Sequence, residues 1–362
     1  MDSLDWKHVP FLLIFASYFL IIIWLFAFML RSLPRNFNKA PASPTIFAGL
    51  TLVSLGHTWF YMLRYMEWSF SHYEQSLKRP ITDGLIARIG SWVHDTSLFN
   101  EAWFVVCRHP FNWWWSEQLC LFTVGAWTIF VVTEGSRHKI KHLWAYMLLG
   151  QIVAISVASN LFYLALVLSP SFSNPKERVK ERWASPMLWF NVFLALASVA
   201  LVPFITERTF LKNLLVMHGV LFLPILEKNS PKISPYAIST NALYRIVQVV
   251  SALIHLRTVL KALEILRDNA ALDASSIVQT AWRVLHAHPA QSSIGWDVIW
   301  TSVSFIVWTM VKPQDATDAS RRFSVSHLLG ATPFASIGVT APYTLSPKGA
   351  PREDFQFDAK VQ

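Results

Sequence analysis

Charged residues are scarce in this sequence. Only 15% of the 362 residues are Asp, Glu, Lys or Arg, whereas a typical soluble domain contains about 25%. A water-soluble protein of this length needs more charge than this to cover its surface. The deficit argues against a disordered chain, a fibrous protein and an ordinary soluble enzyme.

Cysteines and cofactor motifs are also scarce. The two cysteines, Cys107 and Cys120, are too few for a disulfide framework and too far apart for a CxxC metal site. The sequence has no HExxH motif, no pair of DDxxD-type acidic clusters and no Cys/His set with ligand spacing. Walker, GxGxxG and GxSxG motifs are absent as well. We therefore expect neither a metal ion nor another cofactor.

Long apolar runs take the place of charge. The chain is 53% hydrophobic and 14% aromatic. Residues 11–30 contain no charge, and a helix of this length crosses the roughly 30 Å hydrocarbon core of a bilayer. A signal peptide has an apolar region of only about 7–15 residues and a small-residue cleavage site. Because this run is longer and ends in Leu30-Arg31-Ser32-Leu33-Pro34, we interpret it as a retained span.

Eight such runs predict an all-α, polytopic helical bundle in the membrane, because continuous apolar runs are typical of helices and not of barrel strands. The expected spans lie near residues 11–30, 45–65, 115–132, 143–168, 187–204, 210–226, 243–263 and 294–311. The run 243–263 contains several basic residues, so its alternative is an amphipathic helix in the interface. Residues 1–311 would form the transmembrane bundle, and the polar residues 312–362 a largely peripheral tail.

The net charge of +9 has two interpretations, nucleic-acid binding and membrane association. The basic residues form short clusters between apolar runs, which is typical of loops that flank membrane spans. We therefore expect the lipid bilayer as a partner and no nucleic acid. The basic loops fall on both sides of an eight-span layout, so the positive-inside rule does not settle the orientation.

Glu117 is the first candidate for chemistry, because it follows three consecutive tryptophans at the start of the third span. Burial in an apolar, aromatic pocket would let a carboxyl group hold a proton and act as a general acid. Tryptophan faces stabilise cations, so Trp113 and Trp115 are candidate substrate-binding residues. The alternative is a solvated acid beside an interfacial tryptophan belt.

Two more acids lie in the same aromatic stretch. Asp95 and Glu101 are expected to serve as a relay or as alternative acids, because carboxylates in unequal environments commonly divide acid and base roles. The structural alternative for Asp95 is an N-cap of a helix that starts near Thr96.

Polar residues inside other spans complete the candidate site. An ionisable group within a span usually faces a bundle interior or a cavity. Asp297 begins a polar and aromatic stripe on the eighth span and is the rival to Glu117 as the intramembrane acid; its alternative is a structural partner for a base such as Arg257. The other candidate substrate-binding residues are His57, Asn160 and Asn191.

Three segments resemble a known group of enzymes. Residues 92–103 (WVHDTSLFNEAW), 113–118 (WWWSEQ) and 142–151 (HLWAYMLLGQ) are similar to segments of the fungal membrane-bound terpene cyclases of the ascochlorin and ascofuranone type. The motifs cover roughly residues 90–168, and the length and span number match over most of the chain. The resemblance implies cyclisation of a terminal epoxide on a farnesylated aromatic polyketide, in meroterpenoid biosynthesis, without a metal ion or loss of diphosphate.

A second resemblance concerns the first five spans, which look like the emopamil-binding sterol isomerase arrangement. An acid that opens the third span and an Asn in the fifth correspond to Glu117 and Asn191, and the His of the second span corresponds to His57. The chain departs from that pattern at Tyr61, where the family has Glu, and in its three additional spans. A Δ8–Δ7 sterol isomerase is therefore the alternative that this resemblance implies.

Both resemblances imply proton-initiated carbocation chemistry on a lipid. In our hypothesis Glu117, aided by Asp95 or Glu101, protonates the epoxide of a prenylated substrate in an apolar cavity, while Asn191, Asn160 or His57 orients oxygen or accepts the final proton. We expect an enzyme of the endoplasmic reticulum membrane that associates with other enzymes of its pathway. A non-catalytic lipid-binding protein or transporter is the remaining alternative, although the sequence shows no internal repeat and no interrupted span.

Overall fold

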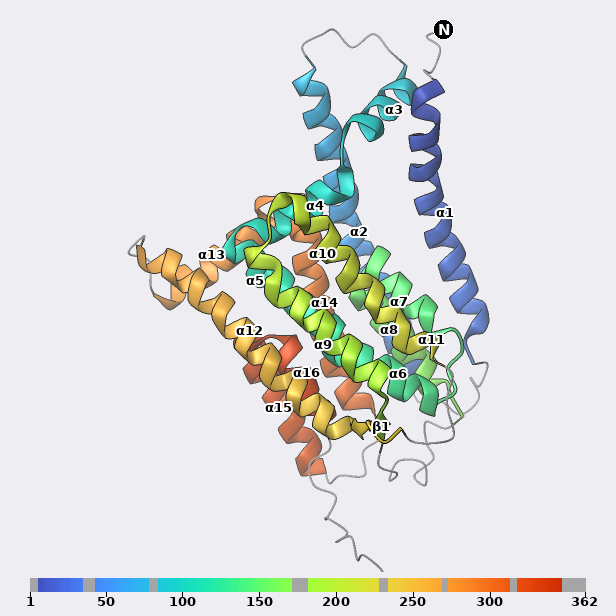
Figure 1. Cartoon of the computed structure of the whole chain (residues 1–362), viewed down its shortest axis with the longest axis vertical. Helices are drawn as coiled ribbons and strands as arrows, with labels where there is room; N and C mark the ends of the chain where they lie inside the picture. Colours follow the sequence, from blue (N-terminus) through green and yellow to red (C-terminus); the bar gives the residue numbers. More distant parts are fainter. Residues whose placement is uncertain are drawn as a thin grey trace, which may run out of the picture.

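The computed structural model describes residues 6–34, 43–77, 84–170, 182–227, 234–268, 273–312 and 318–346. Apart from two short strands, the regular elements of these residues are all helices (Figure 1). In chain order the elements are η1 (Trp6–His8), α1 (Val9–Ser32), α2 (Ser43–Ser76), α3 (Leu85–Asp95), α4 (Leu98–Arg108), α5 (Pro110–Leu121), η3 (Phe122–Trp127), α6 (Thr128–Arg137), α7 (Leu143–Ile152), α8 (Ile155–Val167), β1 (Trp183–Ala184), α9 (Pro186–Leu201), η5 (Val202–Phe204), α10 (Glu207–Gly219), η6 (Val220–Phe222), α11 (Leu223–Leu226), β2 (Ile238–Ser239), α12 (Thr240–Asp268), α13 (Ala274–Ala287), α14 (Pro289–Val311), α15 (Asp318–Ala335) and α16 (Ile337–Leu345).

The chain is an all-α polytopic bundle, as the apolar runs predict. Within the described residues, seven continuous helical segments are long and apolar enough to cross a membrane: Trp6–Ser32, Ser43–Ser76, Pro110–Arg137, Pro186–Phe204, Glu207–Leu226, Thr240–Asp268 and Pro289–Val311. They include the run 243–263, which lies in the 29-residue helix α12. The prediction of eight continuous spans is wrong at one place, because residues 143–168 form two shorter helices.

That interruption separates α7 from α8 at Val153 and Ala154, where the backbone leaves the helical path. A break exposes carbonyl groups at the end of one helix and N–H groups at the start of the next. The Tyr18 hydroxyl donates to the carbonyl oxygen of Ile152 at 2.7 Å. On the other side of the break, a carboxylate from α14 accepts hydrogen bonds from the first N–H groups of α8. Side chains from other helices therefore stabilise the interruption.

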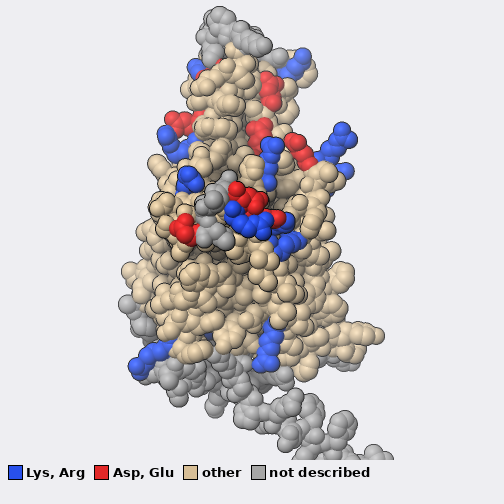
Figure 2. All heavy atoms as spheres, turned by 90° about the vertical axis from the view of Figure 1, so that its left-hand side faces the viewer, with Lys and Arg blue, Asp and Glu red and all other residues tan. Residues whose placement is uncertain are grey.

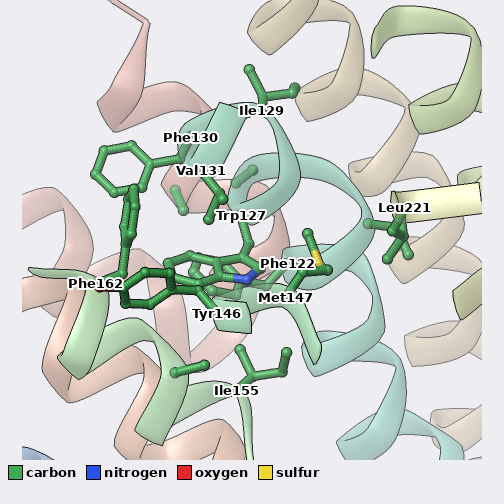
Figure 3. Packing of buried hydrophobic residues seen from close by; sticks show 14 of the residues in the cluster. Phe122, Trp127, Ile129, Phe130, Val131, Tyr146, Met147, Ile155, Phe162 and Leu221 are labelled. Carbon is green, nitrogen blue, oxygen red and sulfur yellow. The ribbon is translucent and has the colours of Figure 1, made fainter. Parts of the chain in front are cut away.

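The centre of the bundle is filled by aromatic side chains. Trp127 meets the ring of Phe162 edge-on at a centroid distance of 5.4 Å, and Tyr146 does so at 5.3 Å. Figure 3 shows these residues converging from η3, α7 and α8. Helix α8 is buried along its whole length, whereas α1 is largely exposed along its span. The interior thus lies around α8 and η3, and α1 covers one side of it (Figure 1).

The C-terminal residues are not wholly peripheral, which corrects the predicted polar tail. Helix α16 has buried residues from Ile337 to Pro342 and packs against α12, α15 and the π-helical segment η3. The contact is close at Gly338, where an added Cβ would lie 2.5 Å from the Cβ of Leu121 and 3.0 Å from the backbone nitrogen of Phe122. Residues 313–317 and 347–362 lie outside the described residues.

Gly338→Ala should lower the free energy of unfolding by about 1–3 kcal/mol, because overpacking a close contact forces its neighbours apart. The matched control is Gly330→Ala in α15, where an added Cβ meets nothing within 4 Å. That change should instead be neutral or stabilise by up to about 1 kcal/mol, because Ala is the better helix former. Thermal unfolding of both variants in detergent micelles measures the difference. Equal effects of the two changes would contradict the close packing of α16.

Charged side chains are unevenly distributed over the surface. On the face shown in Figure 2, they gather toward one end of the molecule, while the rest of this face is largely uncharged apart from a few basic side chains near the opposite end. A partly buried ionic cluster also joins α6 to β1. Glu134 binds Arg137 at 3.1 Å and pairs with Arg182, directly before β1. This cluster anchors the two-stranded ribbon in which β1 pairs antiparallel with β2.

Candidate active site

A cavity of about 360 Å³ lies inside the bundle, beside the break between α7 and α8. Its wall is built by α1, α2, α4, α5, η3, α7, α8, α10, η6 and α14. The lining is mainly apolar, with a few polar side chains. An apolar cavity of this size with a few convergent polar groups is the usual form of a small-molecule site.

Asp297 carries the only carboxyl group among the described residues that line the cavity. It lies on α14 and is 5% exposed. Its Oδ2 accepts from the backbone N–H of Ile155 at 2.9 Å, and its Oδ1 accepts from that of Ser156 at 2.8 Å. The structural alternative of a pair with Arg257 is wrong, because that guanidinium donates to the carbonyl oxygen of Ala200 instead.

These contacts fix the position of the Asp297 carboxylate and place it in the positive electrostatic potential at the start of α8. The N-terminus of a helix carries partial positive charge on its free N–H groups, so it stabilises an anion. Asp297 therefore has a stabilised conjugate base while it lines a mainly apolar space. The buried, mainly apolar surroundings favour the neutral acid, and the N–H groups of α8 stabilise the anion that remains after the proton has left, so this carboxyl group can both hold and release a proton.

Aromatic side chains form another part of the wall. They are Tyr18 from α1 and Phe99 and Trp103 from α4. The Tyr18 and Phe99 rings lie 5.0 Å apart between centroids. Aromatic faces stabilise positive charge, so this wall suits a cationic intermediate. The predicted residues Trp113 and Trp115 do not line the cavity: Trp113 is buried in the core, and the Nε1–H of Trp115 donates to the carbonyl oxygen of Ala281.

Glu117 is fully buried, as expected of an intramembrane acid, but it does not line the cavity. Its Oε1 accepts from the Thr258 hydroxyl at 2.6 Å, and its Oε2 lies 3.1 Å from Nδ1 of His255. Both partners lie on α12. Ser116 and Cys120 on the same helix do line the cavity. The carboxyl group of Glu117 thus turns toward α12, away from the tryptophan pocket that we predicted.

Asp95 and Glu101 lie outside the cavity and are exposed. Asp95 ends α3 and is not the N-cap of α4; that position is Ser97, whose N–H donates to Oε1 of Glu101. The Tyr73 hydroxyl donates to the Asp95 carboxylate at 2.6 Å and lowers the pKa of this group, and His94 adds to the effect. A carboxyl group with a lowered pKa is ionised at neutral pH, so Asp95 is poorly suited to donate a proton.

The remaining predicted residues do not line this cavity either. His57 on α2 accepts from Nε1–H of Trp300 at 3.1 Å. Asn191 on α9 donates to the carbonyl oxygen of Met187. Asn160 on α8 is fully buried, and neither of its amide atoms has a hydrogen-bond partner within the described residues. Among the nine predicted site residues, the cavity therefore contains Asp297 alone.

Sequence reasoning missed three functional candidates that line the cavity: His218 on α10, Cys107 on α4 and Cys120 on α5. A signal for His218 was present, since an ionisable residue within an apolar run usually faces a cavity. A signal for Cys120 was also present. Ser116, Cys120 and Thr123 are four and three residues apart, a spacing that places them on one helical face.

Both cysteines of the chain line the cavity, and this gives a simple test of its existence. N-ethylmaleimide should label the folded protein more slowly than the denatured protein, and farnesol should slow labelling further by filling the apolar space. Single variants Cys107→Ser and Cys120→Ser assign the label by mass spectrometry. A matched control is Glu207→Cys in the cysteine-free background, because Glu207 is exposed at the start of α10. Farnesol should not protect this control, and equal protection of all three sites would contradict the cavity.

Comparisons with known proteins give one partial match. A family model described as a protein of unknown function, DUF2834, matches residues 95–167. This segment contains α4, α5, η3, α6, α7 and α8, which supply much of the cavity wall and the helix break. No curated protein and no solved structure matches the chain. Among the described residues, no group of three or more His, Cys, Asp or Glu side chains is placed to hold a metal ion.

Proposed function

We propose that this protein is a membrane-bound terpene cyclase that opens a terminal epoxide on a farnesylated aromatic substrate and closes the prenyl chain into a ring. The observation that carries the proposal is the carboxyl group of Asp297, the single one among the described lining residues, in a mainly apolar cavity with an aromatic wall. The resemblance of residues 92–103, 113–118 and 142–151 to membrane-bound terpene cyclases supports the same chemistry. The reaction is an isomerisation, because the substrate gains one proton when the epoxide opens and loses one proton after ring closure.

Asp297 replaces Glu117 as the proposed acid. It transfers its proton to the epoxide oxygen, the bond from that oxygen to the more substituted carbon breaks, and the oxygen becomes a hydroxyl group. The π electrons of a neighbouring alkene attack the electron-deficient carbon and form the ring bond. An epoxide oxygen is a weak base, so the transfer needs an acid with a stabilised conjugate base; the N–H groups of Ile155 and Ser156 provide it.

The cavity wall has two further roles in this proposal. Tyr18, Phe99 and Trp103 present aromatic faces to the developing cation. The apolar lining also limits the water that would capture a cation before ring closure. The shape of the cavity holds the flexible prenyl chain in one folded conformation and so selects the ring that forms.

Product analysis tests the proposed function directly. Microsomes that contain the full-length protein receive an epoxyfarnesyl phenol, and extracts are analysed by mass spectrometry and NMR. We expect a product with the mass of the substrate, a new ring and a new hydroxyl group. Microsomes from cells that carry an empty vector are the control. If the substrate is recovered unchanged from well-expressed, correctly folded protein, the proposal is wrong.

We further propose that the protein works in the endoplasmic reticulum membrane and associates with the enzymes that make its prenylated substrate. Such a substrate partitions into the bilayer, so it can reach the bundle without passing through water. The apolar helices support membrane insertion. Co-purification with a prenyltransferase or an epoxidising monooxygenase encoded beside the gene, and co-localisation with a reticulum marker, test these points.

A lipid transporter or lipid-binding protein is the second candidate, and one observation favours it. We expected no interrupted span, but α7 and α8 form one, and the break lies at the cavity. Broken helices with binding sites at the break are common in transporters. In the product assay, a transporter would bind the prenylated phenol and return it unchanged. A sterol isomerase receives less support, because its expected residues His57, Glu117 and Asn191 do not line this cavity.

A further inference from the structure

A second polar group, His218 on α10, lines the same cavity as Asp297. It comes from a different helix, and contacts to its ring and to its backbone position it. Its Nδ1 lies 2.8 Å from the carbonyl oxygen of Leu214, one turn earlier on α10. The amide of Gln151, also a lining residue, donates to the backbone carbonyl oxygen of His218 at 3.3 Å. The Trp103 ring stacks on the imidazole at a centroid distance of 6.2 Å and an interplanar angle of 19°.

These contacts determine which nitrogen can accept a proton. A carbonyl oxygen only accepts hydrogen bonds, so Nδ1 of His218 must be the donor toward Leu214. In the neutral imidazole, Nε2 then carries a lone pair and points away from the backbone of α10. Within the described residues, Nε2 has no hydrogen-bond partner of its own. His218 therefore offers a fixed proton acceptor in the cavity. Among the described lining residues, the titratable oxygen groups are the carboxyl group of Asp297 and the phenol of Tyr18.

Trp103 can stabilise a transient positive charge on the imidazole ring of His218. A cation above an aromatic face, within about 6 Å of its centroid, is stabilised by the ring quadrupole. When Nε2 takes a proton, the imidazolium keeps its Nδ1–H bond to Leu214 and gains this interaction with Trp103. The same wall residue can thus stabilise the carbocation before the proton transfer and the imidazolium after it.

We propose that His218 is the terminal base of the cyclisation, an inference that rests on the proposed function. After ring closure the positive charge lies on a ring carbon. Nε2 removes a proton from an adjacent carbon, the electrons of that C–H bond form a carbon–carbon double bond, and the imidazolium results. The proton returns to the Asp297 carboxylate through water that enters as the product leaves. One proton is donated and one removed, so substrate and product have the same composition.

The test compares His218→Gln and His218→Phe with the wild-type protein in microsomes supplied with the epoxyfarnesyl phenol. Gln keeps polarity but cannot take a proton, and Phe keeps the ring shape. The matched control is His57→Gln, because His57 lies on α2 and outside the cavity. Fluorescence-detected size exclusion checks the folding of each variant, and the products are quantified separately from substrate consumption.

The expected result is a change of product with a smaller change of rate. Both His218 variants should consume substrate within about tenfold of wild type, because Asp297 still initiates the reaction. The cyclic alkene that forms when His218 removes the proton should fall by about tenfold or more as a fraction of all products. Diols from capture of the cation by water, and isomeric alkenes, should replace it. His57→Gln should give the wild-type product. A purely structural role would lower consumption and leave the product pattern unchanged.

Two results would overturn the proposal for His218, and they differ from failure of the proposed function. An unchanged product pattern and rate in folded His218→Phe would show that another group takes the proton. Loss of substrate consumption with an unchanged pattern of residual product would assign His218 a structural role. If the wild-type protein consumes no substrate, the cyclase proposal itself fails, and the assignment of His218 as its base fails with it.

Discussion

Asp297→Asn should lower turnover of the epoxyfarnesyl phenol by about 10²–10⁴-fold, the usual contribution of a positioned general acid. The Asn side chain has almost the size of Asp, and its carbonyl oxygen can still accept a hydrogen bond from the N–H of Ile155 or Ser156. It has no acidic proton to give to the epoxide oxygen. Folding and substrate binding should therefore survive, while the first chemical step should not.

The control is Asp268→Asn, because Asp268 is an exposed acid at the end of α12, where it pairs with Arg267. This variant should turn over at the wild-type rate. Binding of the substrate to Asp297→Asn can be followed through its protection of Cys107 and Cys120 from N-ethylmaleimide, since both thiols line the cavity. Wild-type turnover by well-folded Asp297→Asn would show that the acid is a different group.

Much of the fold could be predicted from the sequence, for a clear physical reason. A backbone in lipid must satisfy its own hydrogen bonds, so long uncharged runs become helices. The predicted runs 11–30, 115–132 and 294–311 lie in the helical segments Trp6–Ser32, Pro110–Arg137 and Pro289–Val311. The membrane character of the chain follows from the same rule. The organelle does not, because hydropathy does not indicate which membrane a protein occupies.

The break within residues 143–168 could not be predicted, because its cause lies in other helices. The segment carries no charged residue and is mainly apolar, and hydropathy alone predicts one span. Asp297 from α14 and Tyr18 from α1 provide the hydrogen bonds that make an interruption tolerable. These residues are more than a hundred positions away in the sequence, so no local pattern reveals the contact. The buried position of α16 was missed for a similar reason, since it depends on the close approach at Gly338.

The identity of the acid depends on the direction in which each buried carboxyl group points from its helix, and composition does not give that direction. Glu117 and Asp297 are both buried acids within predicted spans, as the sequence suggested. One residue of rotation on a helix corresponds to about 100°, and it decides whether a side chain faces a cavity or a neighbouring helix. Ser116 faces the cavity, whereas the next residue, Glu117, faces α12. Which residues share a face can be derived from the sequence, but what that face meets cannot.

Glu117→Ala should lower the free energy of unfolding by about 3–5 kcal/mol, because it removes the buried hydrogen-bond partner of two side chains and leaves a cavity. The carboxyl group is completely buried, and it binds both Thr258 and His255 of α12. Its loss leaves the Thr258 hydroxyl and Nδ1 of His255 without their partner and leaves a void between α5 and α12. Equilibrium unfolding in mixed detergent micelles measures the effect.

Glu117→Gln separates this structural role from catalysis, because the amide oxygen can still accept from the Thr258 hydroxyl but the amide cannot act as an acid. This variant should lose less stability than Glu117→Ala and should retain most of the turnover, in contrast to Asp297→Asn. The matched control for stability is Glu67→Ala, whose carboxylate forms an exposed pair with Arg64 that should contribute about 0–1 kcal/mol. If folded Glu117→Gln were inactive while Asp297→Asn remained active, the proton would come from the face of α5 that meets α12, and the cavity beside α8 would not be the site of the initiating step.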